Sequence, residues 1–374
     1  MRYTMLPRQA LTILKHHGLC MPKKLTIAIT RNCNLACAHC WVEAGQTTAV
    51  DSTMPESVIR RLLQEFLALQ GERICFTGGE PLCHPGFLGM LRTARTLGFE
   101  HVTIQTNGML ITDGWVSAVK QLNFRRLSIQ ISLDGANSPS HDLVRGKGAF
   151  GKALAGITRL VREGMGRNVQ LFFTEMHHNL HEIPALLELA DHLGVNSVTT
   201  GCLVRCGRAA TEASILPPDP DAYLKLLHRY DTDPAFRELY RKLGSVAALE
   251  WRHDSTPRVE GCTFVENPYV TAGGKLYPCV ICHIDDYSVT GVMNKNLAAS
   301  FVEGAAKWSS LLQKSMSRFT SIPECAGCAG RFMCRGGCMG RAWGSCGDLG
   351  AADDRCSVRR CVYQISSPLG IPET

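Results

Sequence analysis

Six short runs of β-forming residues alternate with amphipathic stretches between Lys24 and Cys206, and this alternation restricts the fold more than any other feature of the chain. Val, Ile, Phe and Thr dominate the runs, and Gly, Asn or Asp bounds most of them, which is typical of strands. The predicted strands are Lys24–Thr30, Arg73–Thr77, His101–Thr106, Arg126–Leu133, Val169–Met176 and Ser197–Cys202. Repeated strand–helix units imply parallel strands joined by right-handed crossovers.

Four of the amphipathic stretches are each followed by a glycine, a common residue at the end of a helix. These predicted helices are Pro55–Leu69, Pro85–Leu97, Phe150–Glu163 and Glu182–Leu193, with Gly71, Gly98, Gly164 and Gly194 after them. Six strand–helix units suit an open, partial (β/α)6 TIM-like barrel better than a closed barrel of eight. In such barrels the loops after the C-terminal ends of the strands build the active site.

The pattern changes at Leu216, where a proline-rich segment, PPDPD, begins. Helical patterns and a hairpin signal follow it. These predicted elements are the helices Asp219–Tyr230, Pro234–Lys242 and Leu297–Lys314, and the hairpin strands Phe264–Val270 and Lys275–Cys279. The α/β fold is therefore expected to have four parts: an N-terminal extension (1–23), the partial barrel (24–215), a helical linker (216–259) and a small Cys-rich domain with a hairpin and helices (260–374).

Eighteen cysteines are present among 374 residues, and ten of them lie from Cys262 onward. The N-terminus has no uninterrupted apolar core followed by a cleavage site, and no stretch approaches the length of a membrane span. We therefore expect a cytoplasmic chain that does not cross a membrane. In a cytosolic chain of this size, clustered cysteines favour metal or cluster binding over disulfides.

The formal net charge of +7 comes from basic residues that are scattered along the sequence. Nucleic-acid binding needs a clustered basic face, so no nucleic-acid partner is expected. An anionic substrate is compatible with this charge but is not indicated by it.

The first cysteine motif, ITRNCNLACAHCW, spans Ile29–Trp41 directly after the first predicted strand. Its cysteines, Cys33, Cys37 and Cys40, have the spacing C-x3-C-x2-C, and three thiolates this close can hold an iron–sulfur cluster. Three ligands on a four-iron cluster leave one iron open to an external ligand. Structural zinc sites normally use four ligands, so zinc fits this triad less well.

A cysteine triad after the first strand resembles the hallmark of the radical S-adenosylmethionine (SAM) superfamily. The resemblance implies a catalytic [4Fe–4S] cluster whose open iron is chelated by the amino and carboxylate groups of SAM. One electron from the reduced cluster would break the sulfonium bond, and the resulting 5′-deoxyadenosyl radical would abstract hydrogen from a substrate. The protein would position and shield this chemistry.

Other segments also resemble superfamily motifs: GGE after the second predicted strand, and S-x-D-G and HDxxRG after the fourth. Thr106–Asn107–Gly108, after the third strand, is also common at this place in the family. In the family, the GGE glycines and carboxylate approach the SAM amino group, and the arginine pairs with the SAM carboxylate. The resulting candidate SAM-binding residues are Gly78, Gly79, Glu80, Asn107, Ser132, Asp134 and Arg145. A plain turn at Asn107 and a surface ion pair at Arg145 are the alternatives.

The later cysteines resemble the SPASM extension of radical SAM enzymes, which carries auxiliary iron–sulfur clusters, usually two [4Fe–4S] centres. Carried over from the family pattern, the ligands of the distal auxiliary cluster would be Cys325, Cys328, Cys334 and Cys356. Those of the nearer auxiliary cluster would be Cys262, Cys279 and Cys338. The fourth ligand of the nearer cluster has three alternatives: Cys282, Cys361, or no protein ligand, which would leave one iron available to substrate.

The first substrate hypothesis is a peptide or protein that a radical SAM/SPASM maturase modifies after translation. Only Met1–Lys23 precedes the first strand, so a separate peptide-recognition protein would be needed. Sulfatase-maturing members place an aspartate after the cysteine that matches Cys279, where this chain has Val280, which argues against that activity. The alternative is a small-molecule enzyme of tetrapyrrole or haem-type cofactor biosynthesis, whose carboxylated substrate suits the mild positive charge.

Either enzyme needs a one-electron donor such as flavodoxin or ferredoxin.

The third hypothesis is a non-catalytic zinc or iron–sulfur interaction module. Such a module needs neither a GGE nor an S-x-D-G segment, and both are present, so the sequence favours an enzyme.

Overall fold

The computed structural model describes residues 5–46, 53–253, 256–258 and 261–366, and its centre is a nine-stranded sheet in the order β7-β6-β5-β4-β3-β2-β1-β8-β9. Six of the strands follow one another in chain order and are parallel. They are β1 (Lys24–Ala28), β2 (Arg73–Thr77), β3 (His101–Thr106), β4 (Arg126–Ser132), β5 (Val169–Glu175) and β6 (Ser197–Cys202). The predicted α/β fold is therefore confirmed, and each predicted strand agrees with the observed one to within two residues.

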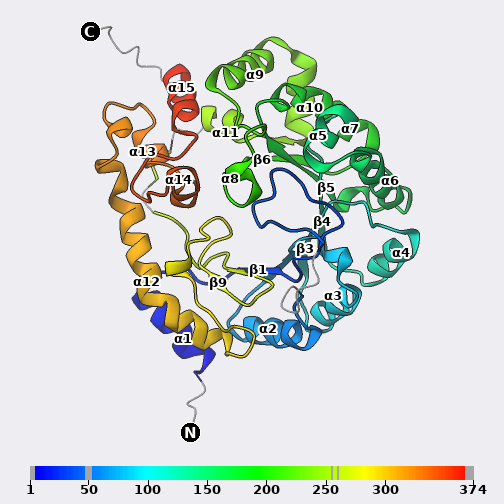
Figure 1. Ribbon diagram of the computed structural model, residues 1–374, viewed down its shortest axis with the longest axis vertical. Coiled ribbons are helices and arrows are strands. Elements are labelled where there is room, and N and C mark those ends of the chain that lie inside the picture. The colour runs from blue at the N-terminus through cyan, green and yellow to red at the C-terminus, as the bar shows by residue number, and fades with distance from the viewer. Residues whose placement is uncertain (1–4, 47–52, 254–255, 259–260, 367–374) are drawn as a thin grey trace.

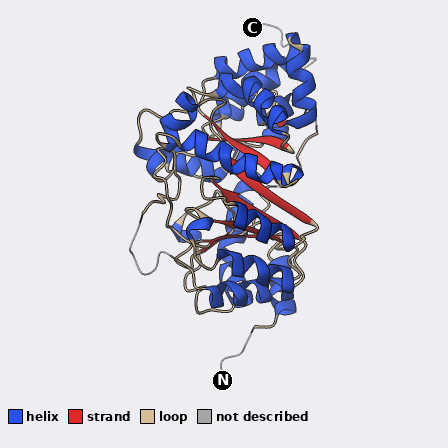
Figure 2. Ribbon diagram, turned by 90° about the vertical axis from the view of Figure 1, so that its right-hand side faces the viewer, coloured by secondary structure: helices blue, strands red, loops and turns tan. Residues whose placement is uncertain are grey.

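Helices lie around the outer side of these strands, and the strands cross the middle of the molecule (Figures 1 and 2). The helices between successive strands are α2 (Glu56–Ala68), α3 (Phe87–Thr96), α4 (Asp113–Gln121), α5 (Ser138–Arg145), α6 (Ala149–Arg162) and α7 (Ile183–Leu193). Alternate residues of β2, Ile74 and Phe76, belong to one hydrophobic core with Ile59 and Phe66 of α2. This core fixes the sheet against its outer helices.

Helices α4 and α5 are absent from the predictions above. Each begins with a side-chain cap: Thr112 accepts a hydrogen bond from the backbone N–H of Trp115, and Asn137 accepts one from Ser140. Caps of this kind are helix-start signals. The helices have only nine and eight residues, which is too few turns for a strong periodic pattern.

The inner face of the strands carries a chain of side-chain amides. Gln105 donates to Gln130 at 2.7 Å, Gln130 donates to Gln170 at 3.0 Å, and Gln170 donates to Thr199 at 2.7 Å. Because an amide both donates and accepts, each group satisfies the next across β3, β4, β5 and β6. The barrel interior is therefore polar, and a cavity with polar walls can exist there without unpaired amides.

Helices dominate the chain after β6, apart from the short strands β7 (Gly244–Ser245), β8 (Tyr269–Val270) and β9 (Leu276–Tyr277). The helices are α8 (Arg208–Thr211), α9 (Pro220–Thr232), α10 (Pro234–Leu243), α11 (Ala247–His253), α12 (Leu297–Ser317), α13 (Arg331–Cys334), α14 (Met339–Cys346) and α15 (Cys356–Ser366). The three helices predicted for this region correspond to α9, α10 and α12. Within the described ranges, no helix has the length and apolar character needed to cross a membrane.

The predicted hairpin is present, with shorter strands, and it joins the main sheet. β8 pairs with β1 in parallel and β9 pairs with β8 in antiparallel fashion, so β1 has a neighbour on both sides. An uncovered β1 would present free backbone groups at a sheet edge. The hairpin thus closes the edge of the barrel and brings the Cys-rich region next to the first strand.

Arg61 of α2 ties the barrel to the segment that leads into α12. Its guanidinium donates to the backbone carbonyls of Val292, Met293 and Lys295 at 2.6–2.9 Å. Glu65, one turn later, accepts a hydrogen bond from the backbone N–H of Leu297 at 2.8 Å. Helix α1 (Pro7–His16) packs on the same long helix, because Ser309 donates to the carbonyl of His17 at 2.8 Å.

Replacing Arg61 with alanine removes hydrogen bonds to three carbonyls, so Arg61→Ala should lower the free energy of unfolding by about 1.5–3 kcal/mol. Chemical denaturation under anaerobic conditions measures this change. The matched control is Arg60→Ala, which alters an exposed arginine of the same helix and should change stability by less than about 0.5 kcal/mol. Equal effects of the two substitutions would contradict the assigned role of Arg61.

Candidate active site

The cysteine loop (residues 29–46) follows β1 and places Cys33, Cys37 and Cys40 on one cavity of about 530 Å³. Arg208 of α8, which follows β6 across the sheet from β1, holds this loop. Its Nε donates to the carbonyl of Cys37 at 2.9 Å, and its Nη2 donates to the carbonyl of Ala44 at 2.6 Å. The three thiols are therefore held by a side chain that is remote in sequence and that the motif analysis missed.

Each of the three sulfurs has a hydrogen-bond donor within reach. The backbone N–H of Leu35 lies 3.4 Å from Cys33 Sγ, and that of Ala44 lies 3.3 Å from Cys40 Sγ. Arg145 Nη1 lies 3.9 Å from Cys37 Sγ. Donors of this kind stabilise thiolate over thiol, so the donor set fits a cluster held by three thiolates.

Burial raises the pKa of Cys33 to about 12 and also raises the pKa of Cys37. A bare thiol at these positions therefore keeps its proton at neutral pH, and metal binding has to displace it. In the part of the chain that the structure describes, no three or more His, Cys, Asp or Glu side chains converge closely enough to hold a single metal ion. The three thiols of the cysteine loop border the cavity instead of converging on one point. This arrangement suits a four-iron cluster, because each thiolate ligand of such a cluster binds a different iron atom.

Gly78 and Gly79, after β2, pack directly against the cysteine loop. The N–H of Gly79 donates to the carbonyl of Thr30 at 2.7 Å, and the N–H of Glu80 donates to that of Asn32 at 2.8 Å. A Cβ on Gly78 would lie 2.3 Å from Thr30 O, and a Cβ on Gly79 would lie 2.3 Å from Asn32 O. Gly78 also has a φ of +145°, which favours glycine. The glycines therefore set the position of the triad as well as lining the cavity.

Glu80 is fully buried and faces away from the cavity lining. Its carboxylate accepts hydrogen bonds from Thr106 Oγ1 at 2.7 Å and from the backbone N–H groups of Asn107 at 2.7 Å and Leu82 at 3.1 Å. Burial raises the pKa of Glu80 despite these donors. The side chain joins the loops after β2 and β3, and contact with the SAM amino group stays a prediction.

Asn107 lines the cavity, and its side chain contacts the cysteine loop. Its Nδ2 donates to Asn34 Oδ1 at 2.8 Å, and its Oδ1 accepts from the N–H of Met109 at 3.0 Å. Asn107 is therefore more than a turn residue, because it links the loop after β3 to the loop after β1.

Asp134 and Arg145 form a buried ion pair, with Arg145 Nε 2.6 Å from Asp134 Oδ2. His39 of the cysteine loop joins them, since its Nε2 lies 3.2 Å from the same oxygen. Burial alone would raise the pKa of Asp134, but Arg145 and His39 outweigh it and hold this pKa well below its usual range. Arg145 and His39 line the cavity, whereas Asp134 and Ser132 do not. Asp134 therefore acts on the cavity through the side chain of Arg145.

A second cavity, of about 340 Å³, has Cys262, Cys279 and Cys338 in its wall, together with Cys282. Burial, followed by the nearby thiols of Cys338 and Cys262, raises the pKa of Cys279 to about 11. The structure therefore brings together the three residues that the sequence assigns to the nearer auxiliary cluster.

The four cysteines assigned to the distal cluster also lie together. Burial, and then the neighbouring thiols of Cys334 and Cys328, raises the pKa of Cys325. Burial and the thiols of Cys334 and Cys325 raise the pKa of Cys356 to about 11. Their number and grouping fit a four-cysteine cluster site.

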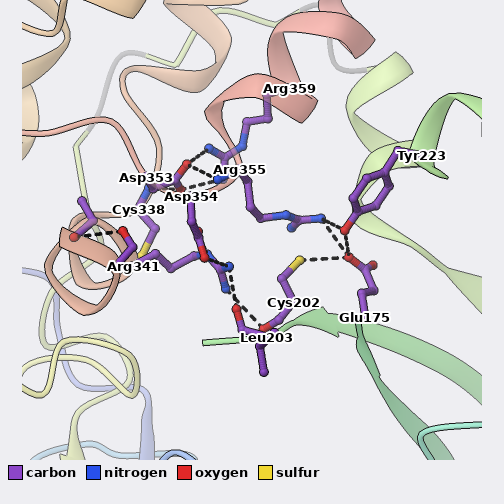
Figure 3. A network of polar contacts seen from close by, with 12 residues as sticks. Glu175, Cys202, Leu203, Tyr223, Cys338, Arg341, Asp353, Asp354, Arg355 and Arg359 are labelled. Atoms are coloured by element: carbon purple, nitrogen blue, oxygen red, sulfur yellow. Dashed lines mark hydrogen bonds and ion pairs between the residues drawn. The ribbon is translucent and has the colours of Figure 1, made fainter. Parts of the chain in front are cut away.

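Three arginine–carboxylate pairs organise the C-terminal segment, and one of them joins it to the end of β5 (Figure 3). Arg341 pairs with Asp354 at 2.7 Å and Arg359 pairs with Asp353 at 2.6 Å. Arg355 reaches Glu175, the last residue of β5, at 2.9 Å. Tyr223 Oη and Cys202 Sγ also donate to the Glu175 carboxylate, at 2.5 and 3.0 Å.

The arginines of this network also reach backbone and the main cavity. Arg341 donates to the carbonyls of Cys202 and Leu203, at 3.2 and 2.7 Å. Both Arg341 and Arg355 line the 530 Å³ cavity. The network therefore positions the C-terminal segment relative to the main cavity.

An aromatic stack joins the cysteine loop to the hairpin. The ring of His283 lies 4.7 Å from those of Trp41 and Tyr269 and 4.9 Å from that of Tyr277, with interplanar angles of 20°, 9° and 24°. Trp41 directly follows Cys40, and His283 directly follows Cys282. Burial lowers the pKa of His283 to about 4, so its ring is neutral at neutral pH. The stack was not predicted, because its members come from separate segments.

Residues 27–190, from β1 to α7, match the family model of the radical SAM superfamily. The chain therefore contains a radical SAM domain, and this domain carries the cysteine loop.

Among curated proteins, the chain is 26% identical to the AdoMet-dependent heme synthase of Methanosarcina barkeri, over 90% of this chain and 97% of that protein. It is 27% identical to the mycofactocin maturase MftC of Mycobacterium tuberculosis, over 86% of this chain and 79% of that protein. A higher identity of 33%, to the AdoMet-dependent heme synthase of Oleidesulfovibrio alaskensis, covers 49% of this chain and 46% of that protein. The chain thus resembles relatives whose names give two different functions.

Solved structures support the fold. Native anSMEcpe with bound AdoMet has a TM-score of 0.70 at 16% identity and covers 92% of this chain and 97% of its own. Streptococcus suis SuiB has a TM-score of 0.67 at 16% identity and covers 93% of this chain and 80% of its own. At these identities the likeness establishes the fold across both cysteine-rich regions. It does not show which reaction the protein catalyses.

Gly79→Ala should displace the cysteine loop, because its Cβ would overlap the Asn32 carbonyl while the backbone φ itself allows alanine. We expect iron bound after anaerobic reconstitution to fall by about one cluster, roughly four irons per chain. The control is Gly151→Ala on α6, where a Cβ meets no atom within 4 Å. If Gly79→Ala bound as much iron as Gly151→Ala, the packing of the two loops would not control the triad.

Proposed function

We propose that this chain is a radical SAM enzyme in which Cys33, Cys37 and Cys40 hold the catalytic [4Fe–4S] cluster. The observation that carries the proposal is the position of the three thiols on one cavity at the C-terminal end of the barrel strands, with a donor at each sulfur. When bound, the cluster supplies the electron that cleaves SAM and so gives a 5′-deoxyadenosyl radical. The residues of the chain bind and orient SAM and the substrate and exclude water.

The proposed SAM pocket uses side chains and backbone that already meet at the cavity. The backbone of Gly78 and Gly79 and the side chain of Asn107 border the triad. Arg145 is oriented by Asp134, and its guanidinium is the proposed partner of the SAM carboxylate. Glu80 and Ser132 complete the pocket in the proposal, Glu80 by fixing the loop after β3.

The proposal places two auxiliary iron–sulfur clusters in a SPASM domain at residues 260–374, after a helical linker at 216–259. The grouping of the C-terminal cysteines around the second cavity and beside α15 supports this part. The barrel at 24–215 and the N-terminal extension at 1–23 complete the proposed division. A flavodoxin or ferredoxin is the proposed electron donor, and the cytoplasm the proposed compartment.

The first proposed substrate is a peptide or protein, which would make the enzyme a maturase. The likeness to the mycofactocin maturases over 86% of this chain supports this class. A separate recognition protein is then the proposed partner. Val280, which stands where sulfatase-maturing members have aspartate, lines the 530 Å³ cavity, so sulfatase maturation is not proposed.

The second proposed substrate is a carboxylated tetrapyrrole. The end-to-end likeness to an AdoMet-dependent heme synthase supports it, and so does the charge of the cavity wall. No Asp or Glu side chain is among the described lining residues, whereas Lys24 and Arg208 line the cavity without an ion-pair partner in the described part of the chain. The other lining arginines are each paired with a carboxylate.

The triple substitution of Cys33, Cys37 and Cys40 by alanine should abolish formation of 5′-deoxyadenosine from SAM and dithionite. Bound iron should fall from about twelve to about eight per chain, because two four-iron clusters would remain. Cys346→Ala, which changes an exposed cysteine outside every cluster set, should alter neither value. Cleavage of SAM by the triple variant would overturn the assignment of the triad.

The substrate class can be read from the rate of 5′-deoxyadenosine formation by the reconstituted enzyme. The true substrate should raise this rate by roughly tenfold or more over the uncoupled rate, because substrate binding completes the site. Iron-coproporphyrin III tests the tetrapyrrole class, and a short Cys-rich peptide encoded beside the gene tests the peptide class. Stimulation by the porphyrin alone would reject the peptide class, and stimulation by the peptide alone would reject the tetrapyrrole class.

A further inference from the structure

The second cavity is bordered by more thiols than the family motif requires. Cys262, Cys279 and Cys338 account for three positions of a four-iron cube, and Cys282 also lines this cavity. We propose that Cys282 is the fourth ligand of the nearer auxiliary cluster, so that all four irons are bound by the protein. This inference rests on the proposed presence of auxiliary clusters.

Cys282 lies on the segment that leaves the β8–β9 hairpin, three residues after Cys279. The C-x2-C spacing is the same as in Cys37–Cys40 and Cys325–Cys328, and it brings two thiols onto one centre. Only 2% of the Cys282 surface is exposed. Its side chain borders the same 340 Å³ cavity as Cys262, Cys279 and Cys338.

A close backbone contact fixes Cys282 relative to Cys338. A Cβ on Gly340 would lie 2.7 Å from the carbonyl oxygen of Ile281 and 3.2 Å from Cys282 Cα, so only glycine permits this approach. The N–H of Cys338 donates to Asp353 Oδ2 at 2.9 Å, and Arg359 holds Asp353 in turn. Cys282 and Cys338 are therefore held across the same cavity by packed backbone, as ligands of one rigid cluster need to be.

The other candidates fit less well. Cys361 lies on α15, is only partly buried, and is not among the residues that line the cavity. Cys334 lines the cavity, but it lies with Cys325 and Cys356 in the distal set. A substrate-accessible iron would need the position that the Cys282 thiol already borders.

The remaining alternative is that Cys282 is an inert core thiol. Cys75 of β2 provides a comparison, because it is 1% exposed and is not among the residues that line this cavity. Cys282 differs from Cys75 in sharing a cavity wall with the three cysteines assigned to the nearer cluster. Complete ligation would also exclude direct coordination of substrate by this cluster, since no iron would be left open.

The test uses the full chain with Cys33, Cys37 and Cys40 replaced by alanine, so that all bound iron is auxiliary. After anaerobic reconstitution, this parent should bind about eight irons per chain and show only four-iron clusters in Mössbauer and EPR spectra. Adding Cys282→Ala should cause the loss of one to four irons, and mild oxidation should give a three-iron EPR signal that the parent lacks. Cys282→Ser should keep the iron with an altered spectrum, because an oxygen ligand replaces sulfur.

Cys75→Ala and Cys361→Ala in the same parent are the controls and should leave iron and spectra unchanged. If Cys282→Ala also left both unchanged, Cys282 would not be a ligand. A three-iron signal from Cys361→Ala would assign the position to Cys361 instead. A parent that bound no iron would reject the auxiliary clusters themselves, and retention of the distal cluster's spectrum in Cys282→Ala shows that the variant is folded.

Discussion

The pairing of β1 on both of its sides is the constraint on which the rest of the site depends. β2 holds one edge of β1 over five residues, and β8 holds the other edge. The first pairing places Gly78 and Gly79 against the cysteine loop. The second brings the hairpin, with Cys279 and Cys282 after it, beside the same strand. One short strand therefore positions both the cysteine loop and the hairpin that carries Cys279 and Cys282, although about 240 residues of chain separate β1 from β8.

Buried charge is compensated around this arrangement in a consistent way. Each of Asp134, Asp354 and Glu175 is paired with an arginine that lines the cavity. Removing one partner of such a pair leaves an uncompensated buried charge, which is far more costly than losing a surface ion pair. The pairs therefore keep the arginines in fixed orientations at the cavity wall. The Arg355–Glu175 pair and the hydrogen bonds from Arg341 to the carbonyls of Cys202 and Leu203 tie the C-terminal segment to the ends of β5 and β6.

The sequence predicts the six parallel strands, four of the helices between them and the triad, because strand and helix periods and cysteine spacing are local properties. It does not predict that the hairpin pairs with β1, since a hairpin pattern reports burial and not which sheet edge it joins. Arg208 and His39 were missed for a similar reason. Their partners are backbone carbonyls or residues on other loops, and no spacing rule connects them. α4 and α5 were missed because their caps are single residues within short segments.

The aromatic stack gives the two cluster loops an intrinsic optical reporter. Trp41, one of five tryptophans, is adjacent to Cys40 and rests on His283, which is adjacent to Cys282. Iron–sulfur clusters absorb in the region where indole emits, so a cluster on either loop would quench this residue by energy transfer. The imidazole beneath it is neutral at neutral pH and adds little quenching of its own. A fall in tryptophan emission can therefore report that a cluster has bound beside this stack, without a label.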